Sequence, residues 1–221
     1  MTRFEAVPYT APFAVYLALL ILHTVHPLPD FAEQAVGLAA MTLVLGLVAR
    51  PALDFRVLRW VPTLLVGTGI FVIWIAPDLL FPDHRHSVLF ENVVLGTARG
   101  SLSEGAHGDP VVLAMRVIRS VVIVPMVEEL FWRGWMMRWV IDADFQRVPL
   151  GAYTATSFWT VAVLFAAEHG PYWDVGLVAG VIFNLWMMRT KSLGDLILAH
   201  AVTNACLGAY VIAAGKWEYW L

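Results

Sequence analysis

Long apolar stretches separated by short polar links run along the whole chain. A helix that crosses the hydrocarbon core of a bilayer needs about 20 mostly apolar residues. By this criterion the pattern predicts seven spans, over Ala11 to His26, Phe31 to Ala49, Trp60 to Leu80, Val111 to Val140, Thr154 to His169, Val175 to Met188 and Leu193 to Ala214. We therefore expect an all-α fold, a polytopic bundle of transmembrane helices.

One amphipathic stretch, Ser87 to Ala98, allows two interpretations. It can form an eighth span, or it can lie in the membrane interface as amphipathic helices do. The link Gly100 to Pro110 that follows is the clearest long loop. We expect one membrane domain in two parts. Residues 1–110 hold the N-terminal helices and the amphipathic segment, and residues 111–214 form a catalytic helical core.

Composition supports a membrane location and narrows the classes of partner. The 221 residues are 60% hydrophobic and 14% charged, with a mean hydropathy of +0.72, whereas soluble domains carry about 25% charged residues. The formal net charge of −3 argues against a nucleic-acid partner. The single cysteine, Cys206, excludes an intramolecular disulfide and a cysteine-rich metal site. Membrane lipids are the first expected partner, and the sequence does not specify an oligomeric state.

The basic residues of the links predict an orientation, because cytoplasmic loops of membrane proteins are enriched in Lys and Arg. With a cytoplasmic N-terminus, the inside segments hold Arg3, Arg50, Arg56, Arg59, Arg138, Arg147, Arg189 and Lys191. The outside segments hold Arg85, Arg99 and Lys216. The first residues lack the features of a signal peptide, so the first apolar segment should be retained. We expect a multi-pass protein of the bacterial inner membrane with its N-terminus in the cytoplasm.

Ionisable side chains within the spans concentrate in the second half of the chain. They occur in the segments VPMVEELFWR, LFAAEHG and LILAHAVTN, whereas the spans of the first half contain almost none. Because an ionisable group inside a bilayer costs at least a few kcal/mol, it is a functional-site hypothesis by default.

The fourth segment carries two adjacent acids, Glu128 and Glu129, and a nearby Arg133. Glu129 and Arg133 are one helical turn apart and can pair, which leaves Glu128 to face a cavity. Pro125 cannot donate a hydrogen bond to the carbonyl group of Val121, so it should bend the helix near the acids. The alternative is a buried ion pair that only holds helices together.

The fifth and seventh segments each carry a pair of residues one helical turn apart, and each pair includes a histidine. Phe165 and His169 share a face, and a Gly-Pro pair directly after His169 should end that helix. His200 and Asn204 share a face of the seventh segment. Taken singly, His169 and the adjacent Glu168 also fit interfacial residues at an ordinary helix end, and Asn204 fits a helix-packing asparagine.

Together the three segments indicate hydrolysis. A carboxylate and a histidine can hold and deprotonate a water molecule, while a second histidine and an amide can donate to the resulting oxyanion. Two histidines and a carboxylate, here His169, His200 and Glu128, can equally bind zinc with an open position for water.

The motifs E-E-x-x-x-R (Glu128, Glu129, Arg133), F-x-x-x-H (Phe165, His169) and H-x-x-x-N (His200, Asn204) appear in this order. In this respect residues 111 to 214 resemble the CPBP family of CAAX-processing and bacteriocin-processing intramembrane endopeptidases, which includes the Rce1-type prenyl-protein proteases and the Abi proteins. The first three spans match only in being hydrophobic.

The resemblance implies a role for each matching residue. Glu128 and His169 would be the general-base pair, His200 and Asn204 would stabilise the oxyanion, and Glu129 and Arg133 would support them. We favour a mechanism without a metal cofactor, because the sequence has no H-E-x-x-H pair and an asparagine suits an oxyanion donor better than a ligand. The expected substrate is a membrane-associated protein or peptide, with lipidated and CAAX-like substrates included.

Two alternatives of other classes stay open. The chain can be a non-catalytic membrane scaffold or immunity protein of the same fold. It can also be a small proton-coupled transporter, since Glu and His in spans also make proton relays, although no internal repeat is visible. A further question concerns depth, because His169 lies about 22 Å along a helix that starts near Thr154, whereas His200 lies nearer the inner side. Either that helix starts outside the membrane, or it tilts into a deep cavity.

Overall fold

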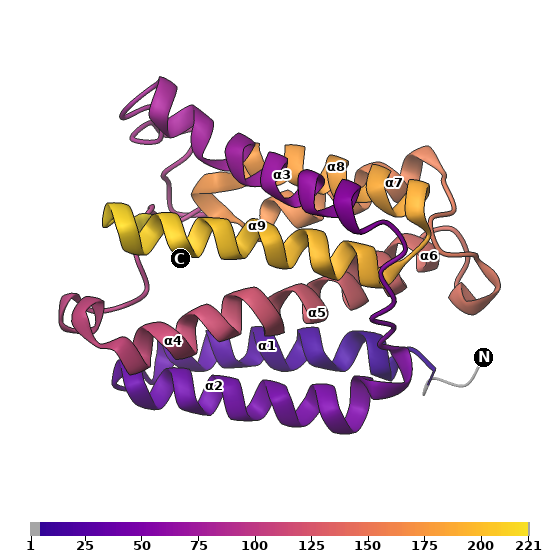
Figure 1. Cartoon of the computed structure of the whole chain (residues 1–221), viewed down its shortest axis with the longest axis horizontal. Coiled ribbons are helices and arrows are strands. Elements are labelled where there is room, and N and C mark those ends of the chain that lie inside the picture. The colour runs from indigo at the N-terminus through magenta and orange to yellow at the C-terminus, as the bar shows by residue number, and fades with distance from the viewer. Residues whose placement is uncertain (1–4, 221) are drawn as a thin grey trace.

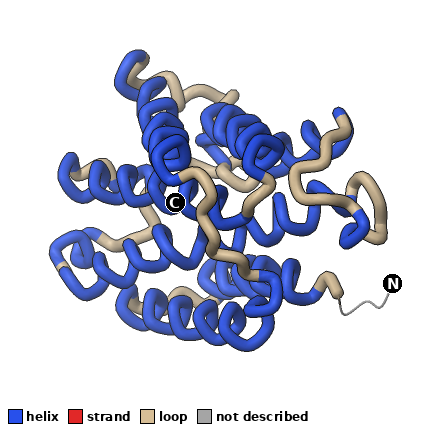
Figure 2. The backbone as a smooth tube through the Cα atoms, turned by 45° about the vertical axis from the view of Figure 1, so that its right-hand side comes forward, coloured by secondary structure: helices blue, strands red, loops and turns tan. Residues whose placement is uncertain are grey.

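The computed structural model describes residues 5–220, and these form a bundle of helices without a strand (Figures 1 and 2). Among the described residues, five helices are long and apolar enough to cross a membrane: Val7–Val25, Asp30–Ala52, Trp60–Leu80, Pro110–Trp139 and Leu193–Ala214. The predicted all-α membrane fold is therefore confirmed, and the chain is an integral membrane protein. Arg3, used in the orientation argument, lies outside the described residues.

Every predicted span forms helix. The α-helices are α1 (Val7–Val25), α2 (Asp30–Val44), α3 (Trp60–Leu80), α4 (Pro110–Ile118), α5 (Val124–Glu129), α6 (Met137–Trp139), α7 (Ala155–Ala167), α8 (Trp173–Thr190) and α9 (Leu193–Ala214). The fifth predicted span is shorter than expected, because α7 has only 13 residues. At 1.5 Å per residue this length is less than the thickness of a hydrocarbon core. The sixth predicted span is α8, with 18 residues.

The possible eighth span does not form, and neither does an amphipathic helix. Residues 87–98 make turns, with the backbone of Asn92 and Gly96 bonded in both directions at 3.2 and 2.8 Å. Gly96 has a φ of 80°, a conformation that suits glycine and closes this tight turn.

The span from Pro110 to Trp139 is interrupted by two wide, π-helical turns. These are η4 (Arg119–Ile123) and η5 (Leu130–Met136), and they flank the six-residue helix α5. Pro125 near the start of α5 explains the first of them, because its nitrogen cannot donate to the preceding turn. Turns of this kind occur frequently at functional sites, and here they set the direction in which the two acids at the end of α5 point.

Close packing joins α3 to α9. Gly67 of α3 lies directly against the backbone of Ala199, where a side chain would collide. At the start of α9, Asp195 accepts hydrogen bonds from the backbone nitrogen atoms of Leu58 and Arg59 at 2.8 and 3.0 Å. These contacts hold an N-terminal helix firmly on the helix that carries His200.

The helices form layers, with α1 and α2 on one side, α4 and α5 next to them, then α9, and α3, α7 and α8 beyond it (Figure 1). The links α2–α3, α6–α7 and α8–α9 lie at the end of the bundle where the described chain starts (Figure 1). These are the links that carry most of the basic residues assigned to the inside segments.

Candidate active site

A cavity of about 400 Å³ lies between the layers, and all four predicted catalytic residues line it. Glu128 comes from α5, His169 from the turn after α7, and His200 and Asn204 from α9. The N-terminal helices contribute apolar and aromatic walls, which sequence analysis did not anticipate. These wall residues include Tyr16, Leu17, Ile70 and Trp74.

The predicted ion pair between Glu129 and Arg133 is present behind the cavity wall. Nη1 of Arg133 lies 3.1 and 3.3 Å from the two carboxylate oxygens, and both side chains are fully buried. Arg133 also donates from Nε to Oδ1 of Asn184 at 2.9 Å and from Nη2 to the carbonyl oxygen of Gly180 at 3.3 Å. The guanidinium group therefore joins α8 to the acid-bearing helix.

Glu128 faces the cavity and has no ion-pair partner at short range. It is 6% exposed, and its Oε2 is buried without a hydrogen-bond partner among the described residues. The nearest cationic candidate, Nε2 of His200, is 4.0 Å away. Because a buried polar atom costs free energy unless it is hydrogen-bonded, this oxygen requires a partner from the cavity, such as water or a substrate.

His169 lines the cavity. Its Nδ1 lies 2.6 Å from the carbonyl oxygen of Phe165, and a carbonyl oxygen only accepts, so Nδ1 carries the hydrogen. In the neutral ring Nε2 then carries the lone pair and can accept a proton. α7 ends at Ala167, and His169 lies in the turn that precedes Gly170, whose φ is 52°. The short α7 thus places His169 and His200 around the same cavity, although the sequence suggested different depths.

His200 and Asn204 already make hydrogen bonds within the protein. Nδ1 of His200 donates to Oε1 of Glu129 at 2.9 Å, which turns Nε2 towards Glu128. Nδ2 of Asn204 donates to the carbonyl oxygen of Ser120 in η4 at 2.8 Å. This is the helix-packing bond considered as an alternative, and it satisfies a backbone group next to the π-helical turn. An amide nitrogen has two hydrogens, so one remains for the cavity.

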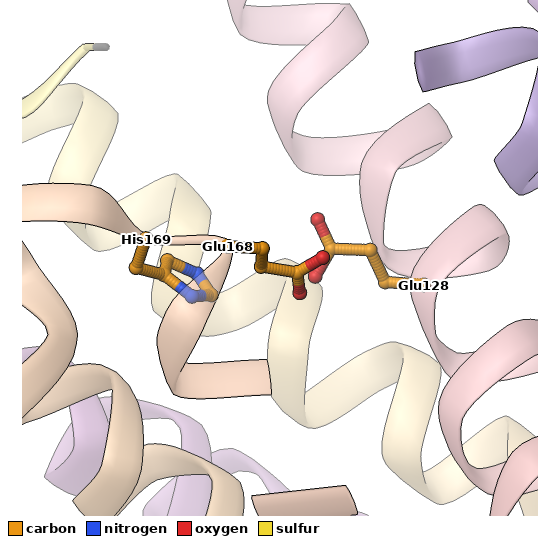
Figure 3. A group of neighbouring side chains, drawn as sticks. All are labelled: Glu128, Glu168 and His169. Atoms are coloured by element: carbon orange, nitrogen blue, oxygen red, sulfur yellow. The ribbon is translucent and has the colours of Figure 1, made fainter. Parts of the chain in front are cut away.

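Glu168 is the site residue that sequence analysis did not select. Its Oε1 accepts a hydrogen bond from the indole nitrogen of Trp132 at 2.9 Å, and its carboxyl group points towards that of Glu128 (Figure 3). Donor atoms of Glu128, Glu168 and His169 all lie within 4.8 Å of one another. Its position beside His169 in LFAAEHG was the available signal, but an acid at a helix end resembles an interfacial residue.

Among the residues that the structure describes, these three side chains lie close enough together to bind one metal cation. The zinc set suggested by the sequence contains His200 in place of Glu168, and the Nδ1 of His200 is already bonded to Glu129. Two carboxylates and an imidazole are suitable ligands for zinc at about 2.0–2.2 Å, so Glu128, Glu168 and His169 fit such an ion after a small contraction.

A buried cluster of carboxylates and histidines around a cavity between membrane helices is the kind of site that an intramembrane hydrolase needs. Comparison with known families makes this more specific. Residues 110–206 match the Rce1-like family, described as type II CAAX prenyl endopeptidase Rce1-like. The match includes all six predicted site residues, and it supports the predicted family and protease activity of the CAAX type in general. No curated protein and no solved structure matches the chain.

Proposed function

We propose that the chain is an intramembrane endopeptidase that hydrolyses a peptide bond of a membrane-associated protein or peptide with a water molecule activated by Glu128 and His169. The observation that carries this proposal is the buried Oε2 of Glu128, which lacks a protein partner and faces the cavity. An ionisable group maintained in this way inside a bilayer protein indicates function rather than packing.

The chemistry needs one base and one site for the water. The water oxygen bonds to the carbonyl carbon of the substrate while Glu128 takes one of its protons, and the carbonyl electron pair moves onto oxygen. Nε2 of His169, whose Nδ1–H is bonded to Phe165, accepts a hydrogen bond from the second O–H group of the water and so orients it. Glu128 then returns its proton to the leaving nitrogen as the carbon–nitrogen bond breaks.

His200 and Asn204 stabilise the oxyanion in this proposal. Because Nδ1–H of His200 is donated to Glu129, donation from Nε2 requires a hydrogen on both ring nitrogens. The Glu129 carboxylate next to the ring holds the imidazole in place through this hydrogen bond. Arg133, on the other side of Glu129, fixes the position of the carboxylate. Glu129 and Arg133 therefore support catalysis without touching the substrate.

We favour a reaction without a metal cofactor. Donor atoms of Glu128, Glu168 and His169 lie within 4.8 Å of one another, so a central atom can lie at up to about 2.8 Å from each, a distance that a water molecule accepts. Zinc requires about 2.1 Å. If zinc binds, these three residues would hold it and the ion would supply an activated water.

The substrate and the orientation complete the proposal. The cavity walls are mostly apolar and aromatic, which suits a lipidated or CAAX-like segment that enters from the membrane. The protein lies in a bacterial inner membrane. The end of the bundle with the links α2–α3, α6–α7 and α8–α9, which carry most of the basic residues, faces the cytoplasm together with the N-terminus. Residues 111–214 act as the catalytic core, and residues 1–110 complete the cavity through α1 and α3.

The test is cleavage of a quenched fluorescent peptide library by the purified protein in detergent, with the products identified by mass spectrometry. Release of fragments cut within the peptide supports the proposal. Binding of peptides without cleavage favours the scaffold or immunity protein, and proton-dependent flux in reconstituted vesicles favours the transporter.

Replacing Asn204 with alanine should lower kcat by about 10²–10³-fold, because that is the usual cost of removing one oxyanion donor. KM should change little, since the donor acts mainly in the transition state. Thermal unfolding in detergent separates this effect from loss of the bond to Ser120. A lower melting temperature with an unchanged kcat would assign Asn204 to helix packing alone.

A further inference from the structure

Glu168 occupies a position that the three family motifs do not account for. It follows the last residue of α7, and its Oε1 is held by Trp132 of η5 at 2.9 Å. This contact comes from the same interrupted span that carries Glu128. The indole group therefore fixes the direction of the Glu168 carboxyl group relative to that of Glu128.

The carboxyl group of Glu168 is aimed at the catalytic pair and not into the bulk of the bundle. Figure 3 shows the carboxyl groups of Glu168 and Glu128 pointing towards one another, with the ring of His169 on the other side of Glu168. Donor atoms of the three side chains lie within 4.8 Å of one another. A single water molecule can therefore be within hydrogen-bond distance of all three.

The two carboxyl groups differ in access to the cavity. Glu128 is buried, with Oε2 lacking a hydrogen-bond partner among the described residues, whereas Glu168 is exposed. A hydrolase inside a membrane must bring water to an apolar site, where an unsolvated polar group is costly. Glu168 and Glu128 line the same cavity, so the exposed carboxyl group of Glu168 offers the polar contact that such a water needs.

We infer that Glu168 is a further catalytic residue, the carboxyl group that holds the attacking water together with Glu128 and His169. The inference rests on the proposed hydrolytic function and adds a third contact to it. Water donates only two hydrogen bonds, so one of the three groups donates to the water in this arrangement. Two carboxyl groups at this separation share a proton readily, which provides that donor.

The test compares Glu168→Gln with the wild type in detergent. The glutamine oxygen can still accept from Trp132, so the helix end keeps its anchor. Glutamine cannot share a proton with Glu128, so we expect kcat to fall by about 10²-fold, the lower end of the usual contribution of proton transfer, with KM and the melting temperature unchanged. Glu218→Gln is the matched control, because Glu218 contacts Lys216 outside the cavity lining.

Chemical rescue separates a catalytic role from a structural one. In Glu168→Ala, added formate should restore part of kcat, because a small carboxylate can occupy the exposed position. An unchanged kcat in Glu168→Gln, or loss in Glu168→Ala that formate does not restore, would overturn the inference. If Glu128→Gln is inactive while Glu168→Gln is fully active, only this inference fails. If the wild type cleaves nothing, the proposed function fails with it.

Discussion

Replacing Glu128 with glutamine is expected to lower kcat for peptide cleavage by about 10²–10⁴-fold, the usual contribution of a general base. Glutamine has nearly the same shape, but its amide cannot take a proton from water. The fold should persist, because Oε2 of Glu128 makes no hydrogen bond to other described residues. The measurement is steady-state cleavage of a peptide found in the library screen.

Glu104→Gln provides the control for this substitution, because Glu104 is an exposed acid in the long link before α4. Its kcat should equal that of the wild type. The proposed mechanism would be wrong if Glu128→Gln, with an unchanged melting temperature, cleaved the peptide as fast as Glu104→Gln.

Replacing Arg133 with methionine should produce the largest loss of stability, about 3–5 kcal/mol, because one partner of a buried ion pair is removed and the other stays buried. Arg133 and Glu129 are both fully buried. Asn184 would also lose the hydrogen bond that it accepts from Nε, and Glu129 would keep only its contact with His200. Denaturant-dependent unfolding in detergent measures the change.

Arg147→Met is the matched control, since Arg147 pairs with Asp144 at 2.7 Å but is 82% exposed. Exposed pairs contribute about 0–1 kcal/mol, so this variant should unfold like the wild type. Equal unfolding midpoints for the Arg133 and Arg147 variants would contradict the structural role assigned to the buried pair.

The spacing of polar residues within apolar helices was sufficient to predict much of the site. A four-residue separation puts Glu129 and Arg133 on one face of a helix, and the structure contains that ion pair. It also leaves Glu128 facing the cavity that His169, His200 and Asn204 line. Their catalytic roles stay predictions.

Other features depend on contacts that local sequence does not encode. Pro125 indicated a bend next to η4, but the spacing of residues gives no signal for the shortness of α7 or for the wide turn η5. Trp132 selects the orientation of Glu168 through a bond between residues 36 positions apart, and no periodicity signals such a bond. The turn at residues 92–96 was missed because its apolar residues resemble one face of an amphipathic helix.

The central claim is that Glu128 activates a water molecule without a metal cofactor. The most direct measurement is cleavage of the selected peptide by the wild type and by Glu128→Ala, each with and without a strong zinc chelator. The account predicts that the wild type keeps its full rate in chelator while the variant is inactive in both conditions. Loss of wild-type cleavage in chelator, with recovery when zinc is restored, would contradict it.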